Sequence, residues 1–404
     1  MNYRFSDASN NTPKSFIREI LKLTQSEDII SFAGGLPNKT FFPVKALQEA
    51  SDKVLANDGA NSLQYSTTEG YLPLREMIAA RYAARGVNVD VNRILITTGS
   101  QQALDLLGKV FLNKNDYVCL ERPSYLGAIQ AFQMFQPRFQ EVDLSQDGID
   151  LPALEQEMQR TDAKFFYGIP NFQNPTGLTY SLQSRQALGE YLQRSGNVMV
   201  EDDPYGELRF IGEHLPNVYA FAPDNVVLLG SFSKVCAPGL RLGWMVANPA
   251  IMERLVTAKQ ASDLHTPIFN QRIMAQYMQD NPLDEHIQTI RDAYFEQRMA
   301  MVEALHEYMP EGVTFTEPEG GMFLWISLPK NCPAMTLFPI AVKHKVAFVP
   351  GEPFSTEGNT SYDIRLSFCG ADAATIKLGV QRLATAISEL TSANTSNNNQ
   401  TVTI

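Results

Sequence analysis

The sequence predicts an α/β protein in which a large domain with a mostly parallel sheet is followed by a smaller α+β domain. Between about Val89 and Gly243, short apolar runs alternate with longer stretches that have apolar residues at helical spacing. Strands that alternate with helices in this way are typical of a parallel sheet covered by helices. After Pro249 the pattern changes to long helical stretches and then short strands with turns, which indicates the second domain.

Five strands are predicted in the first part of the chain, and each ends in a polar or glycine-rich loop. They lie within 93–99, 116–125, 163–177, 196–206 and 225–234. A helix is predicted directly after the first of them, over 100–112. In open parallel sheets a ligand binds beyond the carboxyl ends of the strands, and most of the polar clusters discussed below lie at such ends.

The second part of the chain is predicted to contain a long connecting helix, several short strands and a final amphipathic helix. The helices are expected over 284–309 and about 372–390, and the strands within 321–329, 346–354 and 363–368. The residues after 390 lack apolar periodicity, so we expect a disordered tail. The predicted division is an N-terminal segment that packs with the small domain at the site entrance, a large domain, a small domain and this tail, with bounds 1–45, 46–299, 300–390 and 391–404.

The composition is that of a soluble globular protein and excludes several classes. Hydrophobic residues make up 44% of the 404 residues, and the net charge of −11 argues against general nucleic-acid binding. No stretch has the apolar length of a membrane span, and the first residues lack the core of a signal peptide. Four widely spaced cysteines and five scattered histidines predict neither a disulfide framework nor a metal site, so we expect a cytoplasmic protein.

The segment Ser231-Phe-Ser-Lys234 places a lysine at the end of the fifth predicted strand, where burial is expected. An amine that forms an imine must lose its proton, and both burial and a nearby cation such as Arg241 favour that loss. The hydroxyls of Ser231 and Ser233, together with the Arg241 guanidinium, suit a phosphate dianion. The alternative is a polar turn with a solvated lysine.

Two other strand ends carry groups that suit an aromatic nitrogen heterocycle. A carboxylate of the acidic run 201–203 could hold a proton on a ring nitrogen, and Tyr205 could bond a ring hydroxyl. Three consecutive carboxylates also suit an ordinary helix N-terminus. The segment that begins at Asn174, Asn-Pro-Thr-Gly, is by itself a common turn, and its interest lies in its place at a neighbouring strand end.

Ser100 and Gln101 begin the helix predicted after the first strand, where backbone N–H groups can bind phosphate without a lysine. The alternative for Ser100 is a simple N-cap. Tyr125, in a proline-containing loop, could stack on a flat ring or belong to the core. Arg365 lies inside a short apolar strand and should have a carboxylate partner, either an internal Asp or Glu or a substrate.

These motifs resemble those of pyridoxal-phosphate enzymes of the aspartate-aminotransferase superfamily, fold type I. Ser-x-Ser-Lys-x-x-x-Pro-Gly-x-Arg, Asn-Pro-Thr-Gly and Asp-x-x-Tyr occur in the expected order, and the resemblance covers nearly the whole chain. Within the superfamily the sequence is most similar to the α-aminoadipate/kynurenine aminotransferase subgroup, through 17–25, 30–38, 63–76, 97–106 and 320–329. The resemblance implies the aspartate-aminotransferase-like fold and pyridoxal 5′-phosphate as cofactor.

The resemblance also implies a role for each candidate residue. Lys234 would bond the cofactor covalently and later move the substrate proton, while Asp202 would keep the pyridine nitrogen protonated. Tyr205 and Asn174 would bond the ring oxygen, and Tyr125 would stack on the ring. The phosphate would be held by Ser100, Gln101, Ser231, Ser233 and Arg241.

For the substrate, the resemblance implies that Arg365 binds the α-carboxylate, with Asn174 close by. Arg18, on an N-terminal helix, would meet the distal carboxylate of glutamate or α-aminoadipate; the alternative is a surface arginine. Gly35 and its neighbours at 34 and 36 would line the same pocket, with Phe323 opposite. No metal is implied.

The implied reaction is a ping-pong transfer of an amino group between an L-amino acid and a 2-oxo acid. The donor would be 2-aminoadipate or an aromatic, branched-chain or similar amino acid, with 2-oxoglutarate/glutamate as the common pair. Tyr65 would reach the phosphate bound in the neighbouring subunit of a homodimer with shared active sites. The alternatives are a pyridoxal-phosphate lyase or decarboxylase, and a non-catalytic regulator domain, against which "SFAGGLP" begins at Ser31 and leaves no room for a DNA-binding domain.

Overall fold

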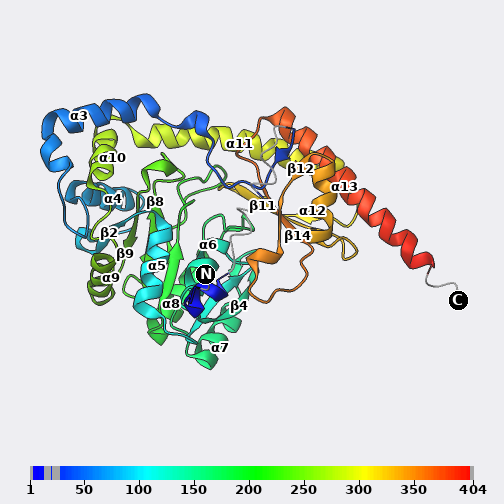
Figure 1. Cartoon of the computed structure of the whole chain (residues 1–404), viewed down its shortest axis with the longest axis horizontal. Helices are drawn as coiled ribbons and strands as arrows, with labels where there is room; N and C mark the ends of the chain where they lie inside the picture. The colour runs from blue at the N-terminus through cyan, green and yellow to red at the C-terminus, as the bar shows by residue number, and fades with distance from the viewer. Residues whose placement is uncertain (1–2, 13–19, 21–27, 401–404) are drawn as a thin grey trace.

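The central sheet has eight strands, in the order β2-β9-β8-β7-β6-β3-β4-β5 (Figure 1). The computed structural model describes residues 3–12, 20 and 28–400. The strands are β2 (Ile94–Thr97), β3 (Tyr117–Arg122), β4 (Arg138–Ser145), β5 (Gly148–Ile149), β6 (Phe166–Gly168), β7 (Met199–Asp202), β8 (Val226–Ser231) and β9 (Gly243–Val246). The pairs β4–β3, β3–β6, β6–β7 and β7–β8 are parallel, whereas β9 runs antiparallel to both β8 and β2, and β5 runs antiparallel to β4.

All five predicted strands are present as β2, β3, β6, β7 and β8, and the prediction of a mostly parallel sheet is confirmed. Burial explains why these strands could be predicted from the sequence, since β2, β6, β7 and β8 are buried at every position. A parallel strand covered on both faces has a continuous apolar run. The sequence-based analysis did not predict β4, where exposed and buried positions are mixed, or the short strands β5 and β9.

The helices in this part of the chain lie around the central sheet. They are α1 (Asp7–Asn11), α3 (Val44–Ser62), α4 (Leu72–Ala84), α5 (Ser100–Phe111), α6 (Leu126–Gln133), α7 (Leu151–Thr161), α8 (Leu182–Ser195), α9 (Pro249–Ser262), α10 (Ile268–Asp280) and α11 (Leu283–Tyr308). Helix α5 contacts β2, β8 and β9, and α7 contacts β3 and β4. The predicted connecting helix is α11, which runs from the central sheet to the smaller sheet (Figure 1).

The smaller sheet is antiparallel, in the order β10-β11-β14-β13. Its strands are β10 (Thr314–Phe315), β11 (Phe323–Ser327), β13 (Val349–Pro350) and β14 (Asp363–Ser367), and its helices are α12 (Ala334–Lys343) and α13 (Ala373–Gln400). Strand β1 (Ile30–Ser31) pairs in parallel with β12 (Val346–Ala347), so the residues just before the site join the smaller unit. The smaller α+β unit is confirmed, and the exact domain bounds stay predictions.

Helix α13 extends to Gln400, whereas the sequence-based prediction ends the helix near Leu390 and expects a disordered tail. Polar residues follow Leu390, but no Gly or Pro follows Gly379 to stop a helix. The absence of apolar periodicity after Leu390 therefore does not mark the end of the helix. The prediction of disorder stays untested for 401–404, which lie outside the described residues.

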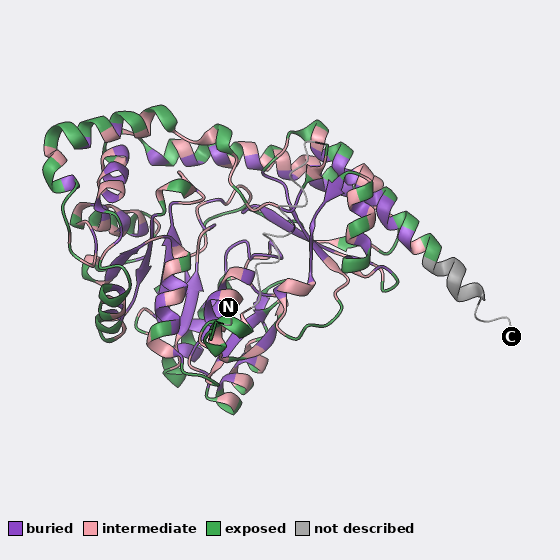
Figure 2. Ribbon diagram, viewed as in Figure 1, coloured by how far each residue is buried: buried purple, intermediate pink, exposed green. Residues whose placement is uncertain are grey.

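The core runs continuously through both sheets. Figure 2 shows the strands buried and the outward faces of the helices exposed. A small second cluster, which includes Ala33, Trp325 and Phe354, packs between the N-terminal segment and the smaller sheet. Within the described ranges, no helix is both long and apolar enough to span a bilayer. All four cysteines are buried and free.

At one end of the central sheet, β9 touches the start of α5. A Cβ atom at Gly243 would lie 2.8 Å from the carbonyl carbon of Gly99 and 2.9 Å from the backbone nitrogen of Ser100. These neighbours are backbone atoms and cannot rotate aside. Gly243 therefore allows the loop before α5 to approach the sheet closely.

We predict that Gly243→Ala lowers the melting temperature by about 2–4 °C, because overpacking of backbone against backbone costs stability. Gly239→Ala is the matched control, since a Cβ atom there would meet nothing within 4 Å. Calorimetry of the two variants and the parent protein makes the comparison. Equal melting temperatures for all three would show that the loop moves aside at no cost.

Candidate active site

A cavity of about 340 Å³ opens at the carboxyl ends of β7 and β8, beside the start of α5. The predicted site residues that line it are Gly35, Leu36, Ser100, Gln101, Tyr125, Asn174, Asp202, Tyr205, Ser231, Ser233, Lys234, Arg241, Phe323 and Arg365. Gly34 is not among the lining residues. The topology explains the convergence, because the carboxyl ends of parallel strands meet at one edge of the sheet.

Lys234 lies just beyond β8, and its Nζ donates a 2.8 Å hydrogen bond to the carbonyl oxygen of Gly35. Burial, together with the nearby cations Arg365 and Arg241, lowers the pKa of this amine to about 8, although Cys369 acts in the opposite direction. The amine therefore loses its proton closer to neutral pH than an exposed lysine does. A lysine in this state is a nucleophile and a proton carrier.

Asp202 is the last residue of β7 and is buried. Its Oδ2 accepts a 2.8 Å hydrogen bond from the Tyr167 hydroxyl, while its Oδ1 is buried without a partner among the described residues. Burial raises the pKa of Asp202 to about 7, and Asp203 raises it too, whereas the bond from Tyr167 lowers it. A buried acceptor without a donor is costly, so this oxygen suits a ligand that brings an N–H group.

Arg365 lies in β14 and is buried between two aromatic rings. Its guanidinium carbon is 4.2 Å from the ring centroid of Phe323 and 5.2 Å from that of Phe354. Its Nη1 donates to Asn174 Oδ1 at 2.8 Å and its Nη2 to the carbonyl oxygen of Ala33 at 2.9 Å. Burial lowers its pKa to about 10.

Two kinds of partner were expected for Arg365, an internal Asp or Glu and a substrate. Among the described residues, the internal Asp or Glu is not found. The hydrogen bonds of Arg365 go to an amide and a carbonyl oxygen, no described Asp or Glu forms an ion pair with it, and its Nε is buried without a described partner. The guanidinium therefore remains available for a carboxylate from outside the protein.

Asn174 connects this arginine to the phenol at the strand end of β7. Its Nδ2 donates to the Tyr205 hydroxyl at 3.5 Å, while its Oδ1 faces Arg365. The ring of Tyr205 packs edge-on against that of Phe323, with the centroids 6.0 Å apart. Gly35 lies against the same ring, since a Cβ atom at 35 would come within 2.8 Å of Phe323 Cζ. Any residue larger than glycine at 35 would therefore force the Phe323 ring to move.

The other side of the cavity is built for an anion. Gly99, with φ +75°, precedes α5 and lets the chain turn so that the helix begins at Ser100. Arg241 Nη2 donates to the carbonyl oxygen of Thr98 at 3.3 Å, which places the cation beside this helix start. On the β8 side, the backbone N–H of Ser233 donates to a hydroxyl oxygen in the same loop, Ser231 Oγ, at 3.1 Å. A helix start, hydroxyls and a guanidinium together favour a phosphate group.

Of the remaining predicted residues, Tyr65 does not line this cavity and Arg18 is not among the described residues. Tyr65 is 78% exposed, with its ring edge-on to that of His265 at 6.0 Å between centroids. Arg18 falls in 13–19, outside the described residues. Among the described residues, no group of three or more His, Cys, Asp or Glu side chains is arranged to hold a metal ion.

The sequence-based analysis missed Tyr167, whose hydroxyl is the only described partner of the Asp202 side chain. Tyr167 lies in β6, beside β7, and its register partner is Val200, two residues before Asp202. The order of the strands, which the sequence does not give, is needed to bring the two side chains together. The analysis also missed the lining residues Leu104, Ile169 and Pro204.

Comparison with known proteins assigns this chain to a family. The model of the family described as aminotransferase class I and II matches residues 27–383, and the chain belongs to this family. It is 45% identical over 390 residues to a 2-aminoadipate transaminase of Thermus thermophilus, covering 96% of this chain and 97% of that one. It is 41% identical over 395 residues to aromatic-amino-acid aminotransferase 1 of Thermococcus litoralis, covering 95% and 94%.

One similar solved structure is that of LysN, an α-aminoadipate aminotransferase of Thermus thermophilus, complexed with N-(5′-phosphopyridoxyl)-L-leucine. Its TM-score is 0.89 at 43% sequence identity, and the match covers 96% of this chain and 98% of that one. The protein is a pyridoxal-phosphate-dependent aminotransferase. The predicted fold, cofactor and similarity to the α-aminoadipate/kynurenine subgroup are confirmed.

The cavity fits this cofactor. When bound, pyridoxal phosphate supplies an aldehyde that bonds amines and a ring that accepts electrons. The lone Asp202 Oδ1 suits the ring nitrogen, the start of α5 with Arg241 suits the phosphate, and the Lys234 amine suits the aldehyde.

We predict that Asp202→Asn stabilises the cofactor-free protein at pH 8. The carboxyl has a pKa of about 7 when folded, against an ordinary value of 3.8, so burying its ionised form costs stability that grows as the pH rises between these values. The melting temperature of the variant should therefore exceed that of the parent protein by about 2–4 °C at pH 8 and match it near pH 4.

Asp52→Asn, on the exposed face of α3, is the control for the loss of one charge. Calorimetry across this pH range gives the result. A constant gap at all pH values would mean that Asp202 does not carry the raised pKa.

Proposed function

We propose that Lys234 is the residue that bonds the cofactor aldehyde and then moves the proton of the substrate during amino transfer. One observation carries this assignment: a single cavity brings together an amine with a lowered pKa, a buried carboxylate oxygen without a donor, and a buried arginine without a carboxylate. Each of these groups is costly unless a ligand complements it. Pyridoxal phosphate with an amino acid complements all three.

The carboxylate of Asp202 holds the proton on the ring nitrogen through its lone Oδ1, with Oδ2 oriented by Tyr167. Tyr205 and Asn174 bind the ring oxygen, and their own long hydrogen bond of 3.5 Å leaves the phenol O–H and the amide N–H free to donate to a shared ligand oxygen. Tyr125 covers one face of the ring. The phosphate is bound by Ser100, Gln101, Ser231, Ser233 and Arg241.

The substrate α-carboxylate binds Arg365, with the amide of Asn174 at its side. We propose a 2-oxo acid as acceptor, with glutamate and 2-oxoglutarate as the common pair, and 2-aminoadipate or an aromatic or branched-chain amino acid as donor. The names of the two sequence relatives support the first two donor classes. Gly35 and Phe323 form the wall that the donor side chain meets, and the distal carboxylate of an acidic donor binds Arg18.

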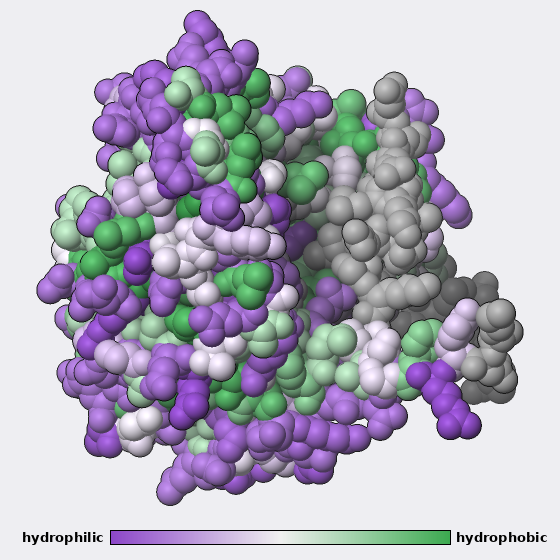
Figure 3. All heavy atoms as spheres, turned by 60° about the vertical axis from the view of Figure 1, so that its left-hand side comes forward, coloured by the Kyte–Doolittle hydropathy of each residue, from purple (hydrophilic) through white to green (hydrophobic). Residues whose placement is uncertain are grey.

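The working form is a homodimer in which Tyr65 binds the phosphate held by the partner subunit. Its 78% exposure within one chain supports this, together with exposed apolar neighbours such as Leu63 and Leu264. Figure 3 shows one face of the molecule, on which apolar patches interrupt a largely hydrophilic surface. The cytoplasm is the proposed compartment, and the four buried free cysteines support it.

We predict that Lys234→Ala lowers kcat/KM for transamination by at least about a thousandfold, because the covalent bond and the proton carrier are both lost. The exposed Lys45→Ala on α3 should keep the parent rate. Borohydride reduction followed by peptide mapping should place the cofactor on Lys234 in the parent protein. Full turnover by Lys234→Ala, or an adduct on a different lysine, would refute the assignment.

Arg18→Ala should slow the half-reaction with 2-aminoadipate and glutamate by about tenfold or more, while leucine and phenylalanine change by less than about twofold. The reason is that only the acidic donors carry a second carboxylate. Arg4→Ala, an exposed arginine near the same end of the chain, is the control. Single-turnover rates for each donor separate the two groups, and equal losses for all four donors would exclude the role.

A further inference from the structure

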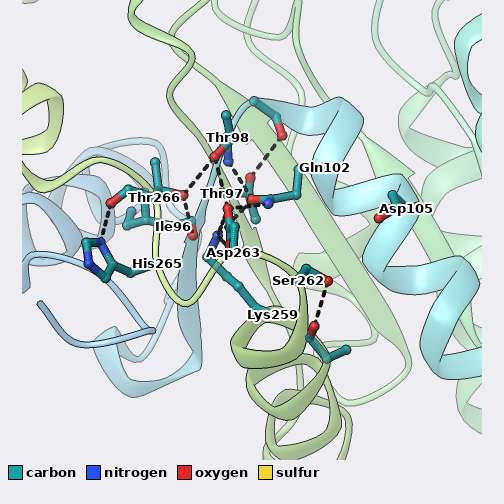
Figure 4. Close-up of polar contacts among 12 residues, drawn as sticks. Ile96, Thr97, Thr98, Gln102, Asp105, Lys259, Ser262, Asp263, His265 and Thr266 are labelled. Atoms are coloured by element: carbon teal, nitrogen blue, oxygen red, sulfur yellow. Dashed lines mark hydrogen bonds and ion pairs between the residues drawn. The ribbon is translucent and has the colours of Figure 1, made fainter. Parts of the chain in front are cut away.

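Outside the cavity, a buried lysine lies beside the loop that precedes α5 (Figure 4). The side chain of Lys259, near the end of α9, is 0% exposed. Its Nζ donates to Gln102 Oε1 at 2.8 Å and to Asp263 Oδ1 at 2.9 Å, and Gln102 Nε2 donates to Asp263 Oδ2 at 2.5 Å. The three side chains thus form a closed ring of hydrogen bonds. None of them lines the cavity, and the chemistry described above does not use them.

The ring controls the orientation of one amide group. Because Lys259 can only donate and the ionised Asp263 can only accept, Gln102 must present its oxygen to the first and its nitrogen to the second. The same oxygen then accepts a 2.8 Å hydrogen bond from the backbone N–H of Thr98. A flipped amide would turn a donor toward this N–H group. The charge pair therefore fixes the acceptor that holds Thr98.

Both backbone polar groups of Thr98 form hydrogen bonds to side chains. Its N–H group donates to Gln102, while its carbonyl oxygen accepts from Arg241, the cation assigned to the phosphate. Gly99 and Ser100 follow directly and form the helix start on which the phosphate would lie. Two hydrogen bonds therefore link buried Lys259 to the loop before α5: one from Lys259 to Gln102, and one from the Thr98 N–H group to Gln102.

A second branch of contacts runs from Thr98 through Thr266 to His265 (Figure 4), and His265 contacts the segment that carries Tyr65. The hydroxyls of Thr98 and Thr266 lie 3.3 Å apart, and the carbonyl oxygen of Thr266 lies 3.0 Å from His265 Nδ1. His265 Nε2 accepts the backbone N–H of Ser66 at 3.2 Å, which requires the ring proton to be on Nδ1. Contacts through Thr266 and His265 therefore connect the Thr98 loop to the other segment proposed to bind phosphate.

We propose that Lys259, Asp263 and Gln102 form a positioning cluster that holds Thr98-Gly99-Ser100 in the geometry that binds the cofactor phosphate. The inference rests on the proposed function of the cavity. It assigns the three residues a role in the affinity for the phosphate group and none in the affinity for the ring. That separation is what an experiment can measure.

The test is Lys259→Met, which keeps the length of the side chain and removes the charge. The cofactor-free variant is titrated with pyridoxal phosphate and with pyridoxal, which lacks the phosphate, and absorbance reports binding. The affinity for pyridoxal phosphate should fall about ten- to a hundredfold, since Asp263 and Gln102 lose a buried partner, while that for pyridoxal changes by less than about twofold. The ³¹P NMR signal of the bound cofactor should shift as well.

Lys109→Met is the matched control. Lys109 also joins α5 to α9, through a 2.8 Å bond to Ser262 Oγ, and it forms an ion pair with Asp105, but it is 39% exposed and has no contact with the Thr98 loop. It should leave both affinities unchanged. Should Lys259→Met fail to fold, Asp263→Asn decides by the same comparison, because it preserves shape at a side chain that is 30% exposed.

Equal losses for pyridoxal phosphate and pyridoxal, or no loss for either, would overturn the role of the cluster. Borohydride mapping of the parent protein keeps this outcome apart from failure of the proposed function. An adduct on Lys234 with equal losses rejects only the cluster. An adduct on another lysine rejects the assignment of the cavity itself.

Discussion

Desolvation of charged groups at one edge of the central sheet is the constraint on which the site depends. Asp202, Lys234 and Arg365 are each shifted toward their neutral forms by burial, and no ion pair among the described residues satisfies any of them. The folded chain bears this cost before a ligand arrives. Under the proposed function, cofactor and substrate supply the charged or polar partners that these groups lack within the chain.

The surrounding loops are held by buried polar contacts rather than by apolar packing alone. Glu121 accepts from the backbone N–H of Ile169, from Gln173 and from Tyr180, and burial raises its pKa to about 7. Gln173 in turn accepts from the backbone N–H and the hydroxyl of Thr176. These bonds fix the turn that carries Asn174, which lies next to Arg365. A satisfied network of this kind makes a loop more rigid.

The same logic applies at the side of the cavity where α5 begins. Lys259 is fully buried yet paired, and its bonds end on the backbone that begins α5. Three loops around the cavity thus have separate supports: Tyr167 behind Asp202, Glu121 behind the Asn174 turn, and Lys259 behind Thr98. Each support comes from an element distant in sequence from the loop that it holds.

The sequence by itself determined the family, the mostly parallel sheet and most of the residues that line the cavity. It did so because buried parallel strands leave continuous apolar runs, and because the chemistry at their ends requires particular residue types at fixed spacing. Only the tertiary structure decided which strands are neighbours, and hence that Tyr167 meets Asp202, that Arg365 has no internal acid among the described residues, and that Lys259 is buried beside Thr98. Such pairings depend on strand order and helix packing, which local sequence patterns do not encode.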